Sequence, residues 1–256
     1  MDILISGSVA YDYLMTFPGK FQDNILLDKI ESISLSFLVD SLVRRRGGVA
    51  PNIAYTLALL GGKPKVLATV GEDFEEYRTW LESKGVDTSW MKVVKGKYTA
   101  SFFATTDQEN AQIASFYPGA MGDAATLSLH EIGDKPDLVV VSPNDPAAMD
   151  KVIEECLALE IPYLYDPSQQ IVRVDGEVLQ YGINGARSLF VNEYEFGMVQ
   201  KKTGMSESDV LENVEFLVVT RGEKGVTIYH QEDHVQVKAV PPKQIVDPTG
   251  AWPFGP

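Results

Sequence analysis

The stretch Arg46-Gly47-Gly48-Val49-Ala50-Pro51-Asn52 opens the first helix that the sequence predicts. Apolar residues recur at helical spacing over residues 52–60, and the apolar run 66–70 follows within a few residues. The pattern therefore predicts a helix followed directly by a strand. This is the repeating unit of α/β folds.

The same alternation continues along the chain. The predicted strands are residues 3–5, 66–70, 138–141, 163–165, 189–191 and 216–219. The predicted helices are residues 52–60, 73–84, 145–160, 193–202 and 206–213, with Asp73 and Asp145 suited to cap two of them. Nearly continuous apolar runs are typical of strands covered on both faces. We therefore predict one doubly wound, mostly parallel α/β domain over residues 1–256, with helices on both faces of the sheet.

Two stretches, residues about 10–37 and about 90–117, break this rhythm. Both are rich in β-forming residues that alternate in type, and a polar turn at 107–110 separates two of the runs. They predict antiparallel strands that form a small β lid projecting from the main layer. Exposed apolar strands need cover, so we expect the lid to close over a ligand or to pair with a second subunit in a homodimer. Residues 220–240 predict a further hairpin.

Composition limits the function. The chain has 256 residues and a net charge of −14, which argues against binding to nucleic acid or to an anionic membrane. No segment approaches the apolar length of a membrane span, and the first residues lack the pattern of a signal peptide, so we expect a cytoplasmic location. The single cysteine, Cys156, allows no disulfide framework and no multi-thiol zinc site within one chain.

The glycine pair Gly47-Gly48 permits a close approach of the backbone, and Asn52 begins a helix whose first N–H groups point outward. Such a site suits a polyhydroxyl ligand, with the Asn52 amide bonded to a hydroxyl. Taken alone, the segment equally fits a plain loop before a helix. For Arg44 and Arg45, which precede it, we predict a solvated position.

The run Asp247-Pro248-Thr249-Gly250-Ala251 matches the start of a phosphate-binding turn, Asp-x-Thr-Gly-Ala-Gly-Asp. Backbone N–H groups at such a turn bind the oxygens of a phosphoryl group. An aspartate at its end would accept the proton of an attacking hydroxyl. Here Trp252 and Pro253 replace the Gly and Asp, and Pro253 offers neither a carboxylate nor an N–H. Taken alone, the five residues equally fit an Asp-Pro turn in a surface loop.

Six segments occur in a characteristic order: residues 7–12, 47–62, 71–73, 192–195, 220–225 and 247–251. Together they resemble the motifs of the ribokinase-like carbohydrate and nucleoside kinase family, over residues 1 to about 251. Within that family the chain is most similar to the bacterial adenosine kinases. This finer similarity rests on residues 34–40, 112–121 and 166–170.

The resemblance implies a nucleoside site. Its residues would be Ser8, Asp12, Ser36, Gly47, Gly48, Asn52, Phe102, Phe116, Gln169, Gln170 and Arg173. Asp12 would accept hydrogen bonds from ribose hydroxyls, and Phe102 and Phe116 would stack on the two faces of a purine. Phenylalanines of a small sheet also serve as core, and Gln169, Gln170 and Arg173 equally fit a surface loop.

The resemblance also implies ATP and Mg²⁺. The ATP-binding residues would be Asn192, Glu195, Thr220, Gly222, Gly225, Asp247 and Thr249, with Gly250 and Ala251 as the remnant of an anion hole. Asn192 and Glu195 would hold the magnesium-water network. The same two residues equally predict a helix N-cap with an acidic first turn. No catalytic residue is assigned, because Pro253 stands at the position of the expected aspartate.

The expected reaction is therefore ATP plus adenosine to ADP plus AMP, a step of purine salvage. Because the base at 253 is missing, we expect nucleoside binding with severely impaired turnover, and a truncated or frame-shifted end of the chain. Two alternatives remain open. A sugar kinase of the same family, acting on ribose or a ketohexose, would need no purine-stacking rings, and a non-catalytic nucleoside-binding protein would bind adenosine without transfer.

Overall fold

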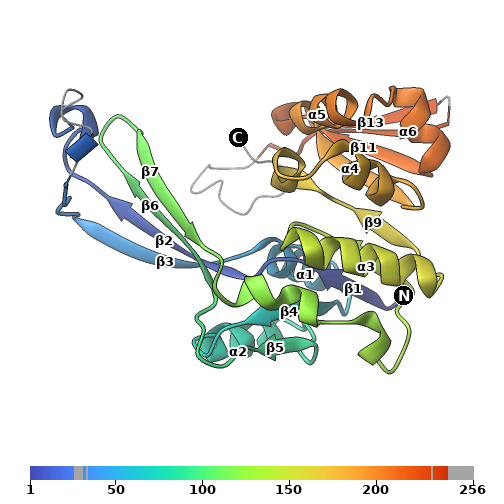
Figure 1. Ribbon diagram of the computed structural model, residues 1–256, viewed down its shortest axis with the longest axis horizontal. Coiled ribbons are helices and arrows are strands. Elements are labelled where there is room, and N and C mark those ends of the chain that lie inside the picture. Colours follow the sequence, from blue (N-terminus) through green and yellow to red (C-terminus); the bar gives the residue numbers. More distant parts are fainter. Residues whose placement is uncertain (26–30, 33, 232, 242–256) are drawn as a thin grey trace.

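The computed structural model describes residues 1–25, 31–32, 34–231 and 233–241. Within these residues a 9-stranded sheet has the order β13-β12-β11-β10-β9-β8-β1-β4-β5 (Figure 1). Its strands are β1 (Ile3–Ser6), β4 (Lys65–Val70), β5 (Met91–Val93), β8 (Leu138–Val141), β9 (Tyr163–Tyr165), β10 (Ser188–Asn192), β11 (Phe216–Thr220), β12 (Val226–His230) and β13 (Asp233–Val237). All neighbours pair in parallel except the β11-β12-β13 hairpins. The doubly wound α/β prediction is confirmed.

Helices cover the sheet from two sides. They are α1 (Val49–Leu59), α2 (Glu75–Ser83), α3 (Pro146–Ala158), α4 (Gly176–Ile183), α5 (Glu193–Thr203) and α6 (Glu207–Asn213). One buried cluster joins Leu4 and Val139 to helices α3 to α6, and the other joins Ile5 and Val140 to α1 and α2. Successive residues of one strand thus enter opposite cores, which explains why these strands are apolar without alternation.

Several helix starts follow the sequence. The Asp145 side chain accepts a hydrogen bond from the Ala147 N–H at 3.1 Å, and Pro146 occupies the first turn of α3. Ser206 and Asp209 form a capping box at α6. The prediction that Asp73 caps α2 is wrong, because its Oδ1 accepts instead from the N–H and hydroxyl of Thr99 at 2.7 and 2.8 Å. Helix α4 was not predicted.

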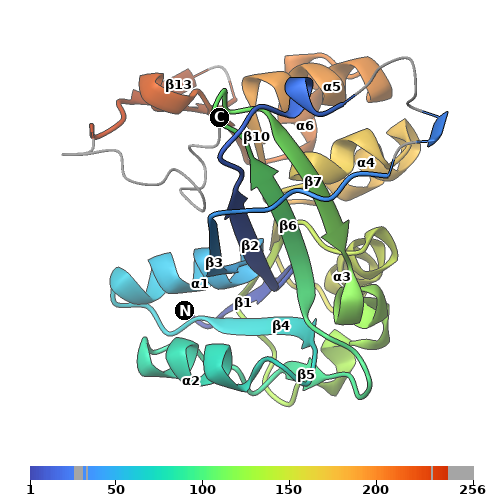
Figure 2. The same cartoon turned by 90° about the vertical axis from the view of Figure 1, so that its left-hand side faces the viewer.

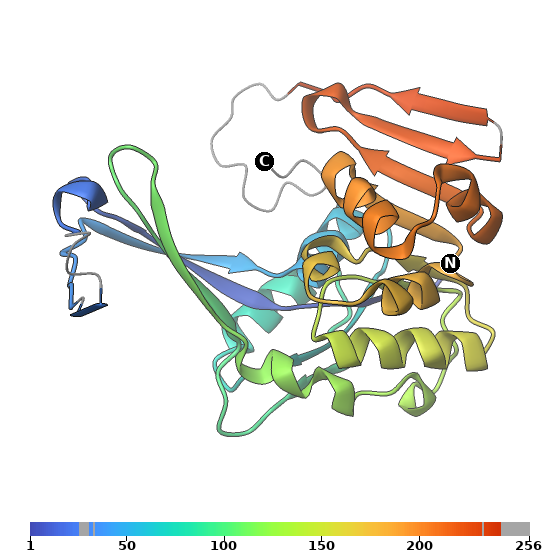
Figure 3. The same cartoon turned by 45° about the horizontal axis from the view of Figure 1, so that its top comes forward.

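A second, 4-stranded sheet among the described residues has the order β3-β2-β6-β7 and projects from the first as a lid (Figures 1 and 3). Its strands are β2 (Ala10–Thr16), β3 (Ser41–Gly47), β6 (Ala100–Thr106) and β7 (Gln112–Tyr117). Figure 2 looks onto the lid from its free end, with α1, β4 and α2 below it. The outer pairs are antiparallel, whereas β2 and β6 run parallel.

The lid differs from the predicted boundaries at two strands. β3 lies beyond residue 37, because its arginine-rich sequence carries no apolar alternation to reveal a strand. β5 lies in the predicted range 90–117 but joins the large sheet, since its buried Met91 packs into the core beneath α1 and α2. The lid therefore consists of residues 10–16, 41–47, 100–106 and 112–117.

One row of apolar side chains in the large sheet lies outside the two buried clusters described above. Phe190, Val218, Ile228 and Val235 are in register across β10 to β13, and none of them belongs to the two buried clusters. Val235 is 62% exposed.

No helix in the described part of the chain has the length and apolarity that a bilayer crossing requires.

Candidate functional site

Most of the candidate residues gather at one edge of the large sheet. The predicted residues Ser8, Asn192 and Thr220 lie at or just beyond the carboxyl ends of β1, β10 and β11. Asn144 and Asp166, which the sequence analysis did not assign to a site, follow β8 and β9, and these five strands are consecutive in the sheet. Parallel strands present their carboxyl ends at the same edge, and ligands of open α/β sheets bind there. Residues far apart in the sequence thus lie in one row at this edge.

The first half of the site is built on Gly47 and Gly48. A β-carbon on Gly47 would lie 2.5 Å from Oδ2 of Asp12, so this carboxylate rests directly on the glycine. Gly48 has a φ of 96°, and a β-carbon there would lie 2.6 Å from the Ser8 carbonyl oxygen. The Ser8 hydroxyl accepts from the Val49 N–H at 3.4 Å. Asn52, half-buried, lies in the first turn of α1.

The lid aligns the predicted rings with Asp12. Asp12 is paired in register with Arg45 on β3 and Phe102 on β6, and Phe102 is paired with Phe116 on β7. Residues paired across strands share one face of a sheet, so the four form a single row. Phe102 is half-buried and Phe116 is 45% exposed. The row thus presents a carboxylate beside two aromatic side chains.

The opposite face of the lid has a structural role. Tyr13 and Phe103 stack there, with ring centroids 4.8 Å apart and an interplanar angle of 12°. Phe103 therefore packs while its neighbour Phe102 is presented on the other face. Arg44 also lies on this opposite face. It is exposed, as predicted, and pairs there with Glu76 of α2.

The other predicted nucleoside contacts are spread out. Ser36 is exposed beside Phe37, whose ring packs on Phe17 and Phe21, and this segment follows β2 at the free end of the lid (Figure 1). Gln169, Gln170 and Arg173 lie in or after η5 (Ser168–Val172), which follows β9. Gln169 and Arg173 are exposed. Gln170 is buried and donates through Nε2 to the Asn144 carbonyl at 2.7 Å, which ties two loops together.

The second half of the site is a carboxylate pair at the ends of β9 and β10. Asn192 and Glu195 form a capping box at α5, each side chain accepting from the other residue's N–H at 2.8 Å. Ser168 donates its hydroxyl to Glu195 Oε1 at 3.4 Å and its N–H to Asp166. Ser168 has a φ of 41°, in a region that non-glycine residues rarely adopt. Strained backbone therefore joins the two carboxylates.

Burial controls the protonation of this pair. Desolvation raises the pKa of Asp166 well above its ordinary value, and the charge of Glu195 raises it further. Desolvation also raises the pKa of Glu195, against the lowering effect of the Asn192 N–H. Oδ1 of Asp166 is buried and makes no hydrogen bond to the described residues. Two crowded carboxylates with an unpartnered oxygen suit a hard cation such as Mg²⁺, so these residues fit the metal that the resemblance implies.

The remaining nucleotide candidates lie beside or beyond this pair. Thr220 is buried in register with Asn192. Gly222 and Gly225 form the following turn with φ of 54° and 93°, and a β-carbon on Gly225 would lie 2.0 Å from the Val237 carbonyl. The close approach of the β13 backbone thus explains a glycine at position 225 without any bound ligand. The candidates Asp247, Thr249, Gly250 and Ala251, and Pro253 at the base position, lie outside the described residues.

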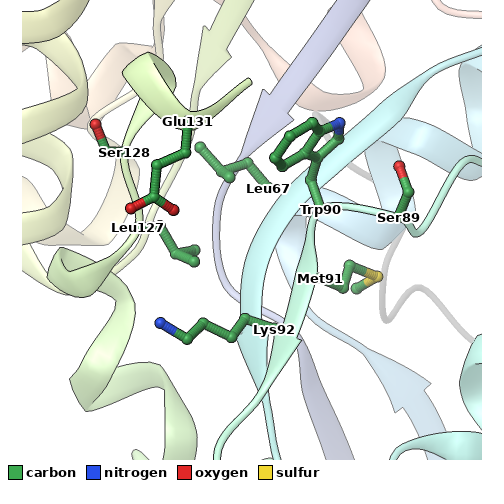
Figure 4. Close-up of a pocket in the computed structure, with 8 residues that line it drawn as sticks. All are labelled: Leu67, Ser89, Trp90, Met91, Lys92, Leu127, Ser128 and Glu131. Atoms are coloured by element: carbon green, nitrogen blue, oxygen red, sulfur yellow. The ribbon is translucent and has the colours of Figure 1, made fainter. Parts of the chain in front are cut away.

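Figure 4 shows a separate cavity, with a volume of about 240 Å³. It is lined by Leu67, Ser89, Trp90, Met91, Lys92, Leu127, Ser128 and Glu131. These residues come from β4, from β5 and the turn before it, and from the helical segments η3 (Gly119–Thr126) and η4 (Leu129–Glu131) with their flanks. None of the predicted site residues lines it.

Comparison with known proteins matches residues 8–251 to the pfkB family carbohydrate kinase model. A nucleoside kinase of Methanothermobacter thermautotrophicus is 30% identical over 98% of this chain and 78% of its own length. The structure of the Burkholderia thailandensis nucleoside kinase in complex with inosine superposes with a TM-score of 0.82 at 38% identity, covering 96% of this chain and 78% of that one. The structure of the Methanocaldococcus jannaschii nucleoside kinase superposes with a TM-score of 0.86 at 26% identity. The match covers 98% of this chain and 81% of that one.

Proposed function

This chain belongs to the pfkB family of carbohydrate kinases, and from that premise we propose that it is a nucleoside kinase whose acceptor is a purine nucleoside. The reaction would transfer the γ-phosphoryl group of ATP to the ribose 5′-hydroxyl. The relatives named as nucleoside kinases support this acceptor class.

The row Asp12, Phe102 and Phe116 carries the proposal. A carboxylate accepts hydrogen bonds from two neighbouring hydroxyls of a ribose, and aromatic faces stack on a base. The row supplies both on one lid face, in adjacent strands, above the glycine pair. A bare sugar would leave Phe102 and Phe116 without a partner.

The roles of the chain's own residues follow from their positions. Asp12, resting on Gly47, would orient the ribose, and Asn52 would donate to a second hydroxyl. Asp166 and Glu195, with Asn192, would hold Mg²⁺, which when bound supplies positive charge to the phosphate oxygens of ATP. Glu195 has a second task, because it also caps α5 and so fixes the start of that helix.

Turnover should be slow in this chain. Pro253 stands where the family motif has the aspartate that accepts the proton of the 5′-hydroxyl. A positioned general base contributes about 10²–10⁴ in rate, and a transfer without one relies on positioning and electrostatics. We therefore propose tight nucleoside binding with weak phosphoryl transfer, and a role in purine salvage only at that reduced rate.

Adenosine is our proposed acceptor, with inosine as the alternative that a specific observation favours. The Burkholderia enzyme, at 38% identity, was solved in complex with inosine. Adenine and hypoxanthine share the ring system that Phe102 and Phe116 would stack on and differ at the 6-substituent. Stacking alone cannot separate them, so both nucleosides belong in the same experiment.

Calorimetric titration with adenosine, inosine and ribose tests the acceptor class. We expect adenosine and inosine to bind, and ribose to bind at least about tenfold more weakly because it lacks the stacked base. Equal affinity for ribose would favour a sugar kinase. A coupled ADP-release assay then separates a slow kinase from a non-catalytic binding protein, which would show nucleoside affinity and no transfer above background.

We also propose that the lid pairs two copies of the chain. All six residues of β7 are exposed, and none carries a charge that would protect this edge of the sheet. The other edge strand, β3, carries three arginines. Sedimentation velocity of the wild type and of Ser115→Lys tests this, since a lysine on the β7 edge should shift a dimer toward monomer.

A further inference from the structure

Helix α2 is bonded to the base of the lid through one carboxylate. Arg44 and Arg46 of β3 each donate to a different oxygen of Glu76, the Arg46 contact being 2.9 Å. Strand alternation places both arginines on the face toward α2 and Arg45 on the face of Asp12. We call Arg44, Glu76 and Arg46 the ion triplet.

Aromatic rings lie beneath both guanidinium groups. The Arg44 guanidinium lies 4.5 Å from the ring centroid of Tyr11, on β2, and that of Arg46 lies 5.0 Å from the centroid of Trp80, on α2. Cation–π contacts orient the two arginines in addition to their shared carboxylate. The ion triplet joins β3 to α2, and the ring of Tyr11 adds β2 to the same contact region.

Two neutral hydrogen bonds accompany the ion triplet. Tyr77 donates its hydroxyl to the Gly47 carbonyl at 3.0 Å, and Tyr11 donates to the Asp73 carbonyl at 3.3 Å. Burial raises the pKa of Tyr11 to about 12, so its hydroxyl stays a donor at neutral pH. Gly47 is the residue on which the Asp12 carboxylate rests, and Tyr11 precedes Asp12 in the chain. Each of the two hydrogen bonds thus involves a residue that adjoins Asp12, either in space or in the chain.

We propose that Glu76 is a positioning residue for the nucleoside site. By joining Arg44 and Arg46 to α2, it holds β3 against the large domain, and with β3 the lid row Asp12, Phe102 and Phe116. Glu76 touches neither of the site halves directly and acts through β3. The inference rests on the proposed nucleoside site for its effect on affinity, and on geometry alone for its effect on the lid.

The chemistry of the ion triplet gives a distinctive readout. Its side chains are 36–63% exposed, so salt screens their attraction. A nucleoside carries no charge at neutral pH, so its own contacts respond little to salt. A fall in nucleoside affinity with ionic strength would therefore report ion pairs within the protein. Removing Glu76 should reduce that salt response.

The test compares Glu76→Gln with Glu75→Gln in the full chain. Glu75 is the matched control, because it lies on the same helix, is highly exposed and pairs only at 3.7 Å with Arg78 of its own helix among the described contacts. Hydrogen–deuterium exchange of the ligand-free proteins reports lid motion. We expect amides of β3 to exchange several-fold faster in Glu76→Gln and unchanged in Glu75→Gln.

Calorimetry of the same variants reports the site. We expect Glu76→Gln to raise the adenosine Kd about three- to tenfold, with less dependence on salt than the wild type, and to leave the ATP Kd unchanged. Glu76→Asp, which keeps the charge, should restore part of the affinity. Unchanged β3 exchange or unchanged adenosine affinity in Glu76→Gln would overturn the proposal. A wild type without nucleoside affinity would refute the proposed function and with it the positioning role, while the exchange data would still show whether Glu76 holds the lid.

Discussion

The carboxylate of Asp12 lies against the α-carbon of Gly47, so closely that a β-carbon there would come within 2.5 Å of Oδ2 and 2.9 Å of Cγ. The two residues are not a direct cross-strand pair, since Asp12 pairs with Arg45 and Gly47 with Ala10. The side chain of Asp12 instead leans along β3 toward the glycine. The absence of a side chain at residue 47 thus sets the orientation of the Asp12 carboxylate, which is proposed to bind the ribose.

Replacing Gly47 with alanine tests this relationship. The added methyl group would displace the Asp12 carboxylate, and we expect the adenosine Kd to rise about tenfold or more in calorimetry. Stability should change little, because Gly47 lies in a strand and its neighbour is the end of a side chain. Gly122→Ala is the control, since nothing lies within 4 Å of its added carbon. Equal affinities of Gly47→Ala and wild type would contradict the assignment of Asp12.

The stacking role of the lid is tested by Phe116→Ala. Loss of one stacking ring should weaken adenosine binding by about 1–3 kcal/mol, or about ten- to a hundredfold, and leave the weak binding of ribose unchanged. The matched control is Ile113→Ala on the same strand, which is 46% exposed against 45% for Phe116 and lies on the other face of the lid. If both variants lost adenosine affinity equally, the effect would come from the lid and not from stacking.

Asp166 should reduce the stability of the protein as pH rises. Burial raises the pKa of Asp166 in the fold well above that of an ordinary aspartate, so the folded protein binds this proton more tightly than the unfolded chain does. The free energy of unfolding therefore falls from about pH 4 up to the folded pKa. Asp166→Asn should remove this loss, so its advantage over the wild type in urea unfolding without Mg²⁺ should grow with pH.

The control for this pH dependence has the opposite sign. Hydrogen bonds from Ser206 lower the pKa of Asp209, so its contribution is present at neutral pH and lost on acidification through the folded pKa. Asp209→Asn should thus destabilise the protein most at neutral pH.

The proposed metal site at Asp166 is tested by adding Mg²⁺, which should raise the melting temperature of the wild type more than that of Asp166→Asn. An equal rise in both would argue against a metal ligand at Asp166.

The missing base is tested by Trp252→Gly combined with Pro253→Asp. The double variant restores the family motif, and we expect the rate of ADP release with adenosine to rise by about tenfold or more. Trp252→Gly alone is the control, since it restores the glycine without the carboxylate. No gain in the double variant would mean that the rate is limited elsewhere than at proton removal.

The sequence predicted the large sheet well for a physical reason. Strands such as β1 and β8 contribute side chains to two cores at once, so residues 3–5 and 138–141 are continuously apolar and can be recognised in the sequence. It failed at β3, where partners far along the chain replace an apolar pattern: Tyr11 from β2, and Glu76 and Trp80 from α2. It also failed at Asp73. The carboxylate of this residue does not cap α2, because it accepts a hydrogen bond from Thr99, which is 26 positions away in the chain.

By itself, then, the sequence determined the class of fold and the family, because apolar periodicity and ordered motifs are local properties. Asp166, the buried partner of Glu195, was not among the site residues that the sequence predicted. Only the tertiary structure decided that Asp12, Phe102 and Phe116 share one face, that Gln170 bonds to a loop, and that Glu76 joins the lid to α2. These relations depend on strand register and on contacts between distant segments, which local sequence does not encode.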